Sequence, residues 1–422
     1  MEKRTAALLL ALATVFALGA NAAEPAGSKP EAAAASEPAA AQTERAETPA
    51  EPEAEGALAF DALGARMRES YYPLLALEEN VQTLEEWDYR RTEDELRDKI
   101  NGIADQQWAY LSTVPGMGSM LSASLQPQYD AYRDAFDDVR SGKLQSDNEG
   151  VTRQLRNLQD QTVIVGESLY ITLKELETQD AALSRTIDAL GRSDAELTLR
   201  HELGQVSALT VQQVRAGLAQ AESARATLRM NADNVLLQLK AMTGTALDGE
   251  LTLAALPRVT AGQLGAMALD DDLARAKEAS YELYDAQKTL DDAKKDYNDA
   301  LKKYGANSKK NEWMQAKHTW QAAQYTFENA LQSYELKFRA LYAQVKDASQ
   351  AADAKRAALA GKEAEYAASA LKYEQGNLSA NALADAKDAL AEAKDAALGA
   401  ERELFSQYRS YCWAVEYGIL NG

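Results

Sequence analysis

Residues 313–341, WMQAKHTWQAAQYTFENALQSYELKFRAL, carry a seven-residue repeat that decides the fold of this 422-residue chain. Large side chains occupy every seventh position, and alanines follow three residues after them. The large row is Trp313, Trp320, Phe327, Tyr334 and Leu341, and the small row is Ala316, Ala323 and Ala330. Because residues at this spacing share one stripe of an α-helix, the stretch predicts a long helix that packs against a second helix.

The preceding stretch, residues 276–304, predicts that second helix. Its two rows have the same period and consist of Ala276, Leu283, Leu290, Tyr297 and Tyr304, and of Ala279, Ala286, Ala293 and Ala300. Gly-Ala-Asn at 305–307 supplies a short turn. Alanines let two helix backbones approach closely while large side chains fill the remaining space. The sequence therefore predicts an antiparallel coiled-coil hairpin.

The first half of the chain shows the same design less regularly. Residues 59–112 and 151–200 have the spacing of helices, with breaks at 113–118 and 141–150. A further helix follows from a seven-residue row of Val214, Ala221, Leu228, Val235 and Met242. The body of the protein is thus predicted to be all-α.

Two segments of the chain align at a constant offset of 172 residues (373 − 201), namely HELGQVSA at 201–208 and YEQGNLSA at 373–380. We expect Gly204 and Gly376 to end a helix in the left-handed conformation, and Ser207 and Ser379 to cap the helix that follows. Each segment then forms the tip of a long hairpin. The alignment predicts two tandem repeats, at 58–245 and 263–420, joined by a connector at 246–262.

The N-terminus has the layout of an export signal. Lys3 and Arg4 precede an apolar run at 6–20, and Ala20-Asn21-Ala22 provides the small residues of a cleavage site. This pattern predicts a signal peptide at 1–22. Residues 23–57 are rich in Ala, Pro and Glu, which predicts a disordered linker. No later stretch approaches the length of an apolar membrane span.

Composition argues against several functional classes. The formal net charge is −20, which disfavours nucleic acid as a partner. The two histidines, His201 and His318, have no metal-ligand spacing around them, and phosphate-binding and nucleophile motifs are absent from the sequence. Cys412 is interpreted as a small core residue rather than a reactive thiol. We expect no catalytic residues, no metal, no cofactor and no enzymatic activity.

The duplicated pattern resembles the TolC-like outer-membrane efflux factor family. The signature segments are YEQGNLS at 373–379 followed by LADA at 383–386, and MALD at 267–270 followed by LYDA at 283–286. The resemblance covers roughly residues 58–420. It rests on two copies in the right order rather than on any single motif.

This resemblance implies a homotrimer whose helices form a tunnel in the periplasm or outside the cytoplasmic membrane. The tips would dock a membrane-fusion adaptor and face an inner-membrane transporter. Tyr373 and Asp385 match polar gate positions of the family. Leu378 and Ala382 stand where the family often has Arg and Asp, so the gate network is partial. In the first repeat, His201 replaces the aromatic residue.

The chain departs from the family in the segments between its long helices. There the family inserts strands that together form a membrane barrel, but 305–310 is too short for a strand pair, and the polarity at 117–125 alternates only briefly. We therefore expect little or no β-structure. Two functions stay open: a component of an efflux or export tunnel, and an exported coiled-coil scaffold of the cell envelope without transport. The envelope location would be the outer membrane and periplasm, or the cell surface in a cell with one membrane.

Overall fold

A computed structural model describes residues 57–113, 116–305 and 311–420. Within these ranges the chain consists of helices and connections, and the pairing of extended backbone is confined to one isolated parallel bridge between Leu58 and Leu253. The predicted all-α class is confirmed. The predicted signal peptide and the linker up to residue 56 lie outside the described residues.

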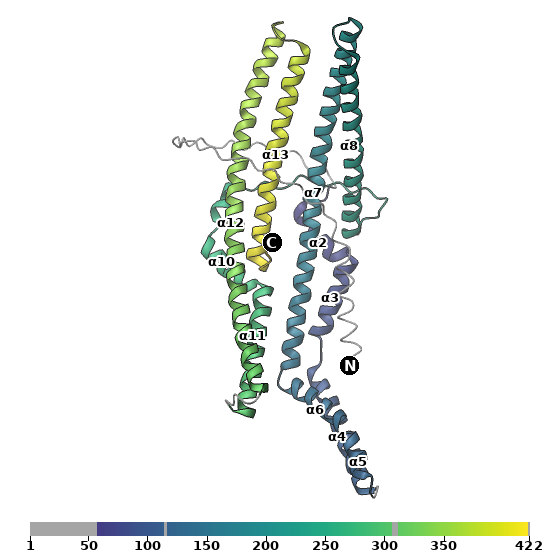
Figure 1. The fold of residues 1–422 in the computed structure, drawn as a ribbon, viewed down its shortest axis with the longest axis vertical. Helices are drawn as coiled ribbons and strands as arrows, with labels where there is room; N and C mark the ends of the chain where they lie inside the picture. The colour runs from purple at the N-terminus through teal and green to yellow at the C-terminus, as the bar shows by residue number, and fades with distance from the viewer. Residues whose placement is uncertain (1–56, 114–115, 306–310, 421–422) are drawn as a thin grey trace. The chain divides into compact units, whose positions relative to one another are not determined.

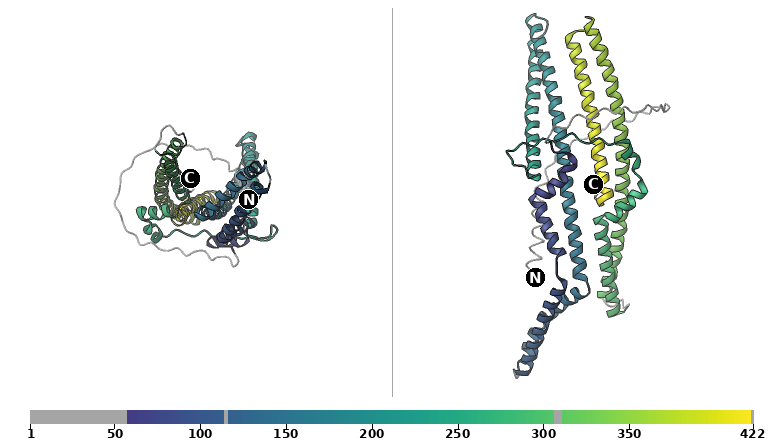
Figure 2. Two further views of the ribbon diagram at one scale, coloured as in Figure 1. Left: turned by 90° about the horizontal axis from the view of Figure 1, so that it is seen from below. Right: turned by 180° about the vertical axis from the view of Figure 1, so that it is seen from behind.

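Four long helices form the main layer (Figure 1). They are α7 (Lys143–Glu202), α8 (Ala208–Met242), α12 (Asn311–Glu374) and α13 (Ala380–Tyr417). The pairs α7/α8 and α12/α13 are antiparallel hairpins, and α7 packs against α13. The order across the layer is therefore α12, α13, α7, α8, as the front and back views both show (Figure 2).

Contacts between α7 and α13 place both hairpin tips at the same end of the layer. Arg185 pairs with Asp395 and Arg192 pairs with Asp388, one heptad further along each helix. Closer to the tips, the Asn381 amide donates to the Glu196 carboxylate over 3.0 Å. These contacts fix the register between the hairpins.

Shorter helices extend the layer away from the tips. In the first half these are α2 (Phe60–Ser70), α3 (Tyr72–Glu85), α4 (Tyr89–Thr113), α5 (Gly118–Ser124) and α6 (Gln126–Arg140). In the second half they are α9 (Ala261–Ala266), α10 (Leu269–Ala279) and α11 (Tyr281–Tyr304). Helix α11 packs antiparallel to α12, where Tyr297 stacks on Trp320 with ring centroids 4.9 Å apart. The heptad rows meet as the sequence predicts.

The structure corrects three helix boundaries. The predicted break at 141–150 is too long. The chain turns at Gly142, which has φ 76°, and α7 begins at the next residue, Lys143. Residues 59–112 form three helices with interruptions at Tyr71 and at 86–88. Residues 276–304 are not one helix either. Ser280 adopts an extended conformation and caps α11, accepting the Leu283 N–H over 3.3 Å.

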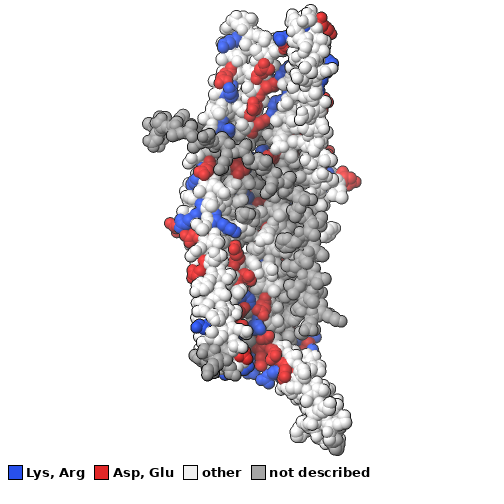
Figure 3. All heavy atoms as spheres, in the orientation of Figure 1, with Lys and Arg blue, Asp and Glu red and all other residues white. Residues whose placement is uncertain are grey.

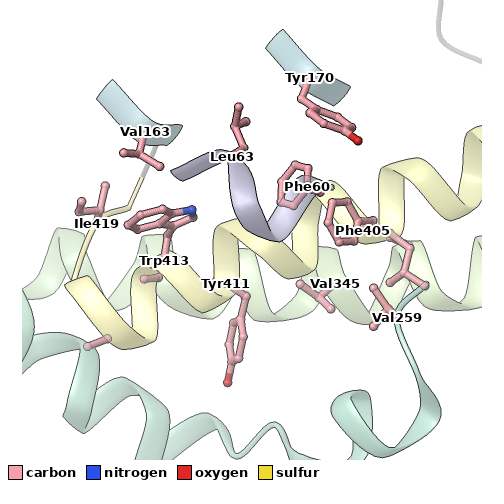
Figure 4. Close-up of a cluster of buried hydrophobic side chains, with 14 of the residues drawn as sticks. Phe60, Leu63, Val163, Tyr170, Val259, Val345, Phe405, Tyr411, Trp413 and Ile419 are labelled. Carbon is pink, nitrogen blue, oxygen red and sulfur yellow. The ribbon is translucent and has the colours of Figure 1, made fainter. Parts of the chain in front are cut away.

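A single hydrophobic core joins the two halves where α2, α7, α12 and α13 meet (Figure 4). The Phe60 ring packs edge-on against Phe405 and Tyr170, with centroids 4.8 and 5.3 Å apart. The buried Tyr170 hydroxyl lies 2.8 Å from the carbonyl oxygens of Leu58 and Ala254, which ties the connector after α8 to the core. Among the described helices, none has an apolar stretch long enough to cross a membrane.

Candidate functional site

The tip of the first hairpin is built by local sequence. Gly204 is left-handed (φ 71°), and the N–H groups of Gly204 and Gln205 donate to the carbonyl oxygens of His201 and Arg200, both over 2.8 Å. These two bonds are a Schellman motif, which satisfies the last carbonyls of α7. Ser207 then caps α8 by accepting the Thr210 N–H over 3.3 Å.

The tip of the second hairpin repeats this geometry at the same offset. Gly376 has φ 73°, and the N–H groups of Gly376 and Asn377 donate to the carbonyls of Tyr373 (2.9 Å) and Lys372 (2.8 Å). The Ser379 hydroxyl accepts the Ala382 N–H over 3.2 Å and caps α13. The two tips thus have one backbone design, which comes from their Gly and Ser positions.

The two side chains that match gate positions of the family are exposed. Tyr373 is 43% exposed at the end of α12, and Asp385 lies on an exposed face of α13. His201 contacts the Val206 carbonyl through Nδ1 (2.9 Å), which supports its interpretation as a structural residue of the tip. Tyr373 and Asp385 lie on different helices of the second hairpin, at the end of α12 and near the start of α13.

Exposed leucines surround the first tip, and sequence reasoning missed them. Leu199, Leu203 and Leu209 are 58%, 64% and 62% exposed, and Leu371 beside the second tip is 55% exposed. Leucines four residues apart share one face of a helix, and such a face is normally buried. Their spacing alone therefore did not predict that these leucines are exposed. An apolar tip is a surface on which another helix could pack.

At the second tip, replacing Gly376 by valine is expected to lower the free energy of unfolding by about 1–3 kcal/mol, because a β-branched residue is forced into the left-handed region. Chemical denaturation followed by circular dichroism measures the loss. The matched control is Gly191→Val inside α7, where an added Cβ also meets no neighbouring atom but φ is not positive. Equal losses in the two variants would contradict the role assigned to the left-handed glycine.

Helix α8, at one end of the layer, has a second heptad row that faces away from α7. We call it the α8 seam. All its residues are exposed, and most are small: Leu209, Gln212, Ala216, Ala219, Ser223, Ala226 and Met230. Spacings of three and four residues place them on one stripe of the helix. Such a row of small residues is typical of a helix that packs closely against another helix.

Helix α12, at the other end of the layer, has a matching row, which we call the α12 seam. It runs toward the tip and consists of Gln350, Ala354, Ala357, Gly361, Ala364, Ala368 and Leu371, all exposed. The α12 seam runs antiparallel to the α8 seam and has the same alternation of three and four. Within the described residues, the two end helices of the layer therefore both expose a row of mostly small side chains with the same spacing.

Buried polar groups hold the layer together in its middle. The Glu167 carboxylate of α7 accepts bonds from the Arg409 guanidinium (2.9 and 2.7 Å) and from the Trp413 indole N–H (2.8 Å) of α13. Glu167 is 4% exposed. A carboxylate in this position is tolerated because it has a cation and a further donor.

A second buried carboxylate, Asp272, lies at the start of α10. Burial raises its pKa, but hydrogen bonds from Tyr411, from the Ala268 N–H and from Arg275 outweigh that effect and lower the pKa. Asp272 lies in the acidic first turn of α10, beside Asp270 and Asp271. Asp272 is 3% exposed and lies against Tyr411, and this burial was not visible in the sequence.

In the described ranges, no group of three His, Cys, Asp or Glu residues comes together in the manner of a metal site. Cys412 is half-buried beside the core residues Tyr411 and Trp413, and burial raises the pKa of its thiol, so the thiol is protonated at neutral pH. Burial and the neighbouring Cys412 raise the pKa of Tyr408 to about 12.

Comparison with known proteins bears on the fold. No protein-family model matches the sequence, and no curated protein matches it. Among solved structures, CusC, which was studied for folding and transmembrane channel formation, is similar with a TM-score of 0.50 and 14% identity, over 84% of this chain and 99% of that chain. A membrane protein from Pseudomonas aeruginosa is similar with a TM-score of 0.50 and 13% identity, over 86% and 90%. The predicted fold of long tandem helical hairpins is confirmed, and this chain shares it with structures described as channel or membrane proteins.

Proposed function

We propose that three copies of this chain assemble into a helical tunnel that serves as the conduit of an efflux or export system in the cell envelope. The observation that carries the proposal is the pair of exposed, complementary seams at opposite ends of the four-helix layer. A surface that matches a different surface of the same molecule forms head-to-tail contacts, and these produce a closed ring when the rotation between copies allows it.

The proposed register between the seams rests on contacts inside one chain and on the offset of 172 residues (373 − 201) between the two repeats, which relates α7 to α12 and α8 to α13. Arg185–Asp395 and Arg192–Asp388 show that residues whose numbers add to 580 lie level on α7 and α13. Applied to α8 and α12 of neighbouring copies, the same sum pairs Ala216 with Ala364, Ala219 with Gly361, and Ala226 with Ala354. Small residues then face small residues through the central part of both seams, which allows close helix packing.

The tips supply the second part of the proposal. Six hairpin tips of a trimer would gather at one end of the tunnel, each with a Gly turn and a Ser cap. The exposed Leu199, Leu203 and Leu209 offer an apolar surface on which an α-helical hairpin of a membrane-fusion adaptor can pack. Gly204, Ser207, Tyr373, Gly376, Ser379 and Asp385 are proposed to shape this docking end toward an inner-membrane transporter.

Disulfide cross-linking tests the assembly. In a Cys412→Ala background, the double variant Ala216→Cys/Ala364→Cys is expected to form covalent dimers and trimers under mild oxidation, with no larger species on a non-reducing gel. The two positions lie on the outer faces of the layer's end helices, so the bond joins neighbouring copies. Light scattering of the unoxidised protein gives the same stoichiometry independently.

The control double variant, Ala216→Cys/Ala343→Cys, moves one thiol three heptads along α12, about 31 Å from the proposed partner. It is expected to remain monomeric on the gel. Cross-linking of both double variants to the same extent would show random collision. A strict monomer at every concentration would rule out the tunnel and favour the envelope scaffold.

A further inference from the structure

Helices α4, α5 and α6 form an addition to the first half that has no counterpart in the second half within the described residues. Leu96, Ile100 and Ile103 of α4 are buried along the hairpin that α4 makes with α6. Helix α5 folds back tightly on the end of α4, since a Cβ added at Gly118 would lie 2.3 Å from the Tyr110 carbonyl oxygen. The hairpin extends beyond the junction of α6 and α7 (Figure 1).

The far end of this hairpin carries no charge. Between Asp105 and Asp130 there is no Asp, Glu, Lys, Arg or His, the longest such run in the chain. In a protein with 26% charged residues this is a local exception. The space-filling view shows the end as a continuous white surface, whereas red and blue patches cover the neighbouring helices (Figure 3).

Large apolar side chains cover this uncharged end and point into solvent. Trp108 and Met120 are 72% and 74% exposed, and Leu111 and Met117 are 53% and 57% exposed. We call these four residues the apolar end. Trp108 and Leu111 share one face of α4. Met117 lies in the turn before α5 and Met120 lies on α5, which packs on the end of α4.

Residue types are ordered along the hairpin axis. Leu111 lies in the last turn of α4, and Trp108 lies about 7.5 Å back from Thr113, at which α4 ends. The first charge, Asp105, lies about 12 Å back. A bilayer interface accepts apolar side chains to a depth of about 5–10 Å, with Trp at the headgroup level. The hairpin can therefore enter to that depth without burying a charge.

We propose that the apolar end of the α4–α6 hairpin inserts into the interface of an uncharged lipid bilayer. The next surface along the hairpin is net acidic, with Asp130, Asp134, Asp137 and Asp138 on α6, so attraction to anionic lipid is not the driving force. Protein interfaces also combine an apolar centre with a polar rim, so binding of a second protein is an alternative outcome that the test below distinguishes.

Vesicle co-sedimentation tests the proposal. The purified protein is expected to bind phosphatidylcholine vesicles, with little change when anionic lipid is added or when salt rises from about 0.1 to about 1 M. The double variant Trp108→Ser/Met120→Ser is expected to lower the partition coefficient by about tenfold or more. Circular dichroism checks that both proteins keep the same helix content.

The matched control is Tyr72→Ser/Leu247→Ser, which removes two exposed apolar side chains of α3 and of the connector (83% and 61% exposed). This control is expected to bind vesicles like the original protein. Absence of vesicle binding, or an equal loss in both double variants, overturns the proposal.

If Trp108→Ser/Met120→Ser instead abolished self-association in lipid-free solution, a second copy would be the occupant and the proposal would be wrong. Cross-linking through Ala216→Cys/Ala364→Cys is expected to persist in the Trp108→Ser/Met120→Ser protein, so the two proposals fail separately.

Discussion

Replacing Gly418 by alanine is expected to lower the free energy of unfolding by about 2–4 kcal/mol, from an unfavourable backbone conformation and an overpacked contact together. Gly418 ends α13 at φ 67°, and an added Cβ would lie 2.3 Å from Ser280 N and Cα. Both neighbours are backbone atoms, so a rotamer change cannot relieve the contact. The Gly418 carbonyl also accepts from the buried Tyr334 hydroxyl over 3.1 Å, which restricts movement of the chain end.

Gly376→Ala separates the two contributions. Gly376 has nearly the same conformation (φ 73°), but an added Cβ meets no atom within 4 Å. This variant is expected to lose only about 1 kcal/mol, from backbone conformation alone. Denaturant titrations followed by circular dichroism compare the two. If Gly418→Ala lost no more than Gly376→Ala, the close packing of α13 against the α10–α11 junction would be refuted.

Replacing Arg409 by methionine is the second large effect that we expect, a loss of about 3 kcal/mol. The Glu167 carboxylate is buried, and the guanidinium supplies two of its hydrogen bonds. Methionine keeps much of the packing volume but leaves the negative charge without its cation. The indole N–H of Trp413 remains as a donor and cannot replace a charged partner.

A double-mutant cycle tests this assignment. Glu167→Gln/Arg409→Met removes both charges and is expected to recover most of the stability lost in Arg409→Met. The control Arg91→Met breaks an exposed pair with Glu95, whose side chains are 75% and 52% exposed, and is expected to cost less than about 0.5 kcal/mol. If the double variant were as unstable as Arg409→Met, the cost would come from lost packing rather than from the unpaired carboxylate.

A further repeat signal lies in the sequence, outside the two tip segments. The helix segment DALGARMRE at 61–69 and the segment DDDLARAKE at 270–278 share Asp, Ala-Arg and Glu at an offset of 209 (270 − 61). The offset at the tips is 172, and the difference of 37 residues falls where the first half holds α4–α6 and the second half holds a short turn. This similarity supports the proposed duplication and places the additional hairpin in the first half.

Local features were within reach of the sequence. The heptad rows of 276–304 and 313–341 predicted α11 and α12 and their pairing, since helix periodicity and apolar spacing act between near neighbours. The left-handed turns at Gly204 and Gly376 and the caps at Ser207 and Ser379 follow from single residue types. The exposure of the leucines around the tips could not be predicted, because spacing shows which residues share a face of a helix but not whether another helix packs on that face.

The helix classes, the hairpins and the two tips were determined by the sequence alone, because each depends on residues a few positions apart. The tertiary structure alone decided the break at Ser280, the order α12–α13–α7–α8 and the burial of Glu167 beside Arg409. The helix order and the burial of Glu167 join residues far apart in the chain, and the break at Ser280 is the place where Gly418 of α13 packs against the backbone. The seven-residue spacing of apolar side chains continues across the one-residue break at Ser280, so the spacing does not reveal the break. The sequence around Glu167 is the same whether its carboxylate lies in water or beside an arginine of a distant helix.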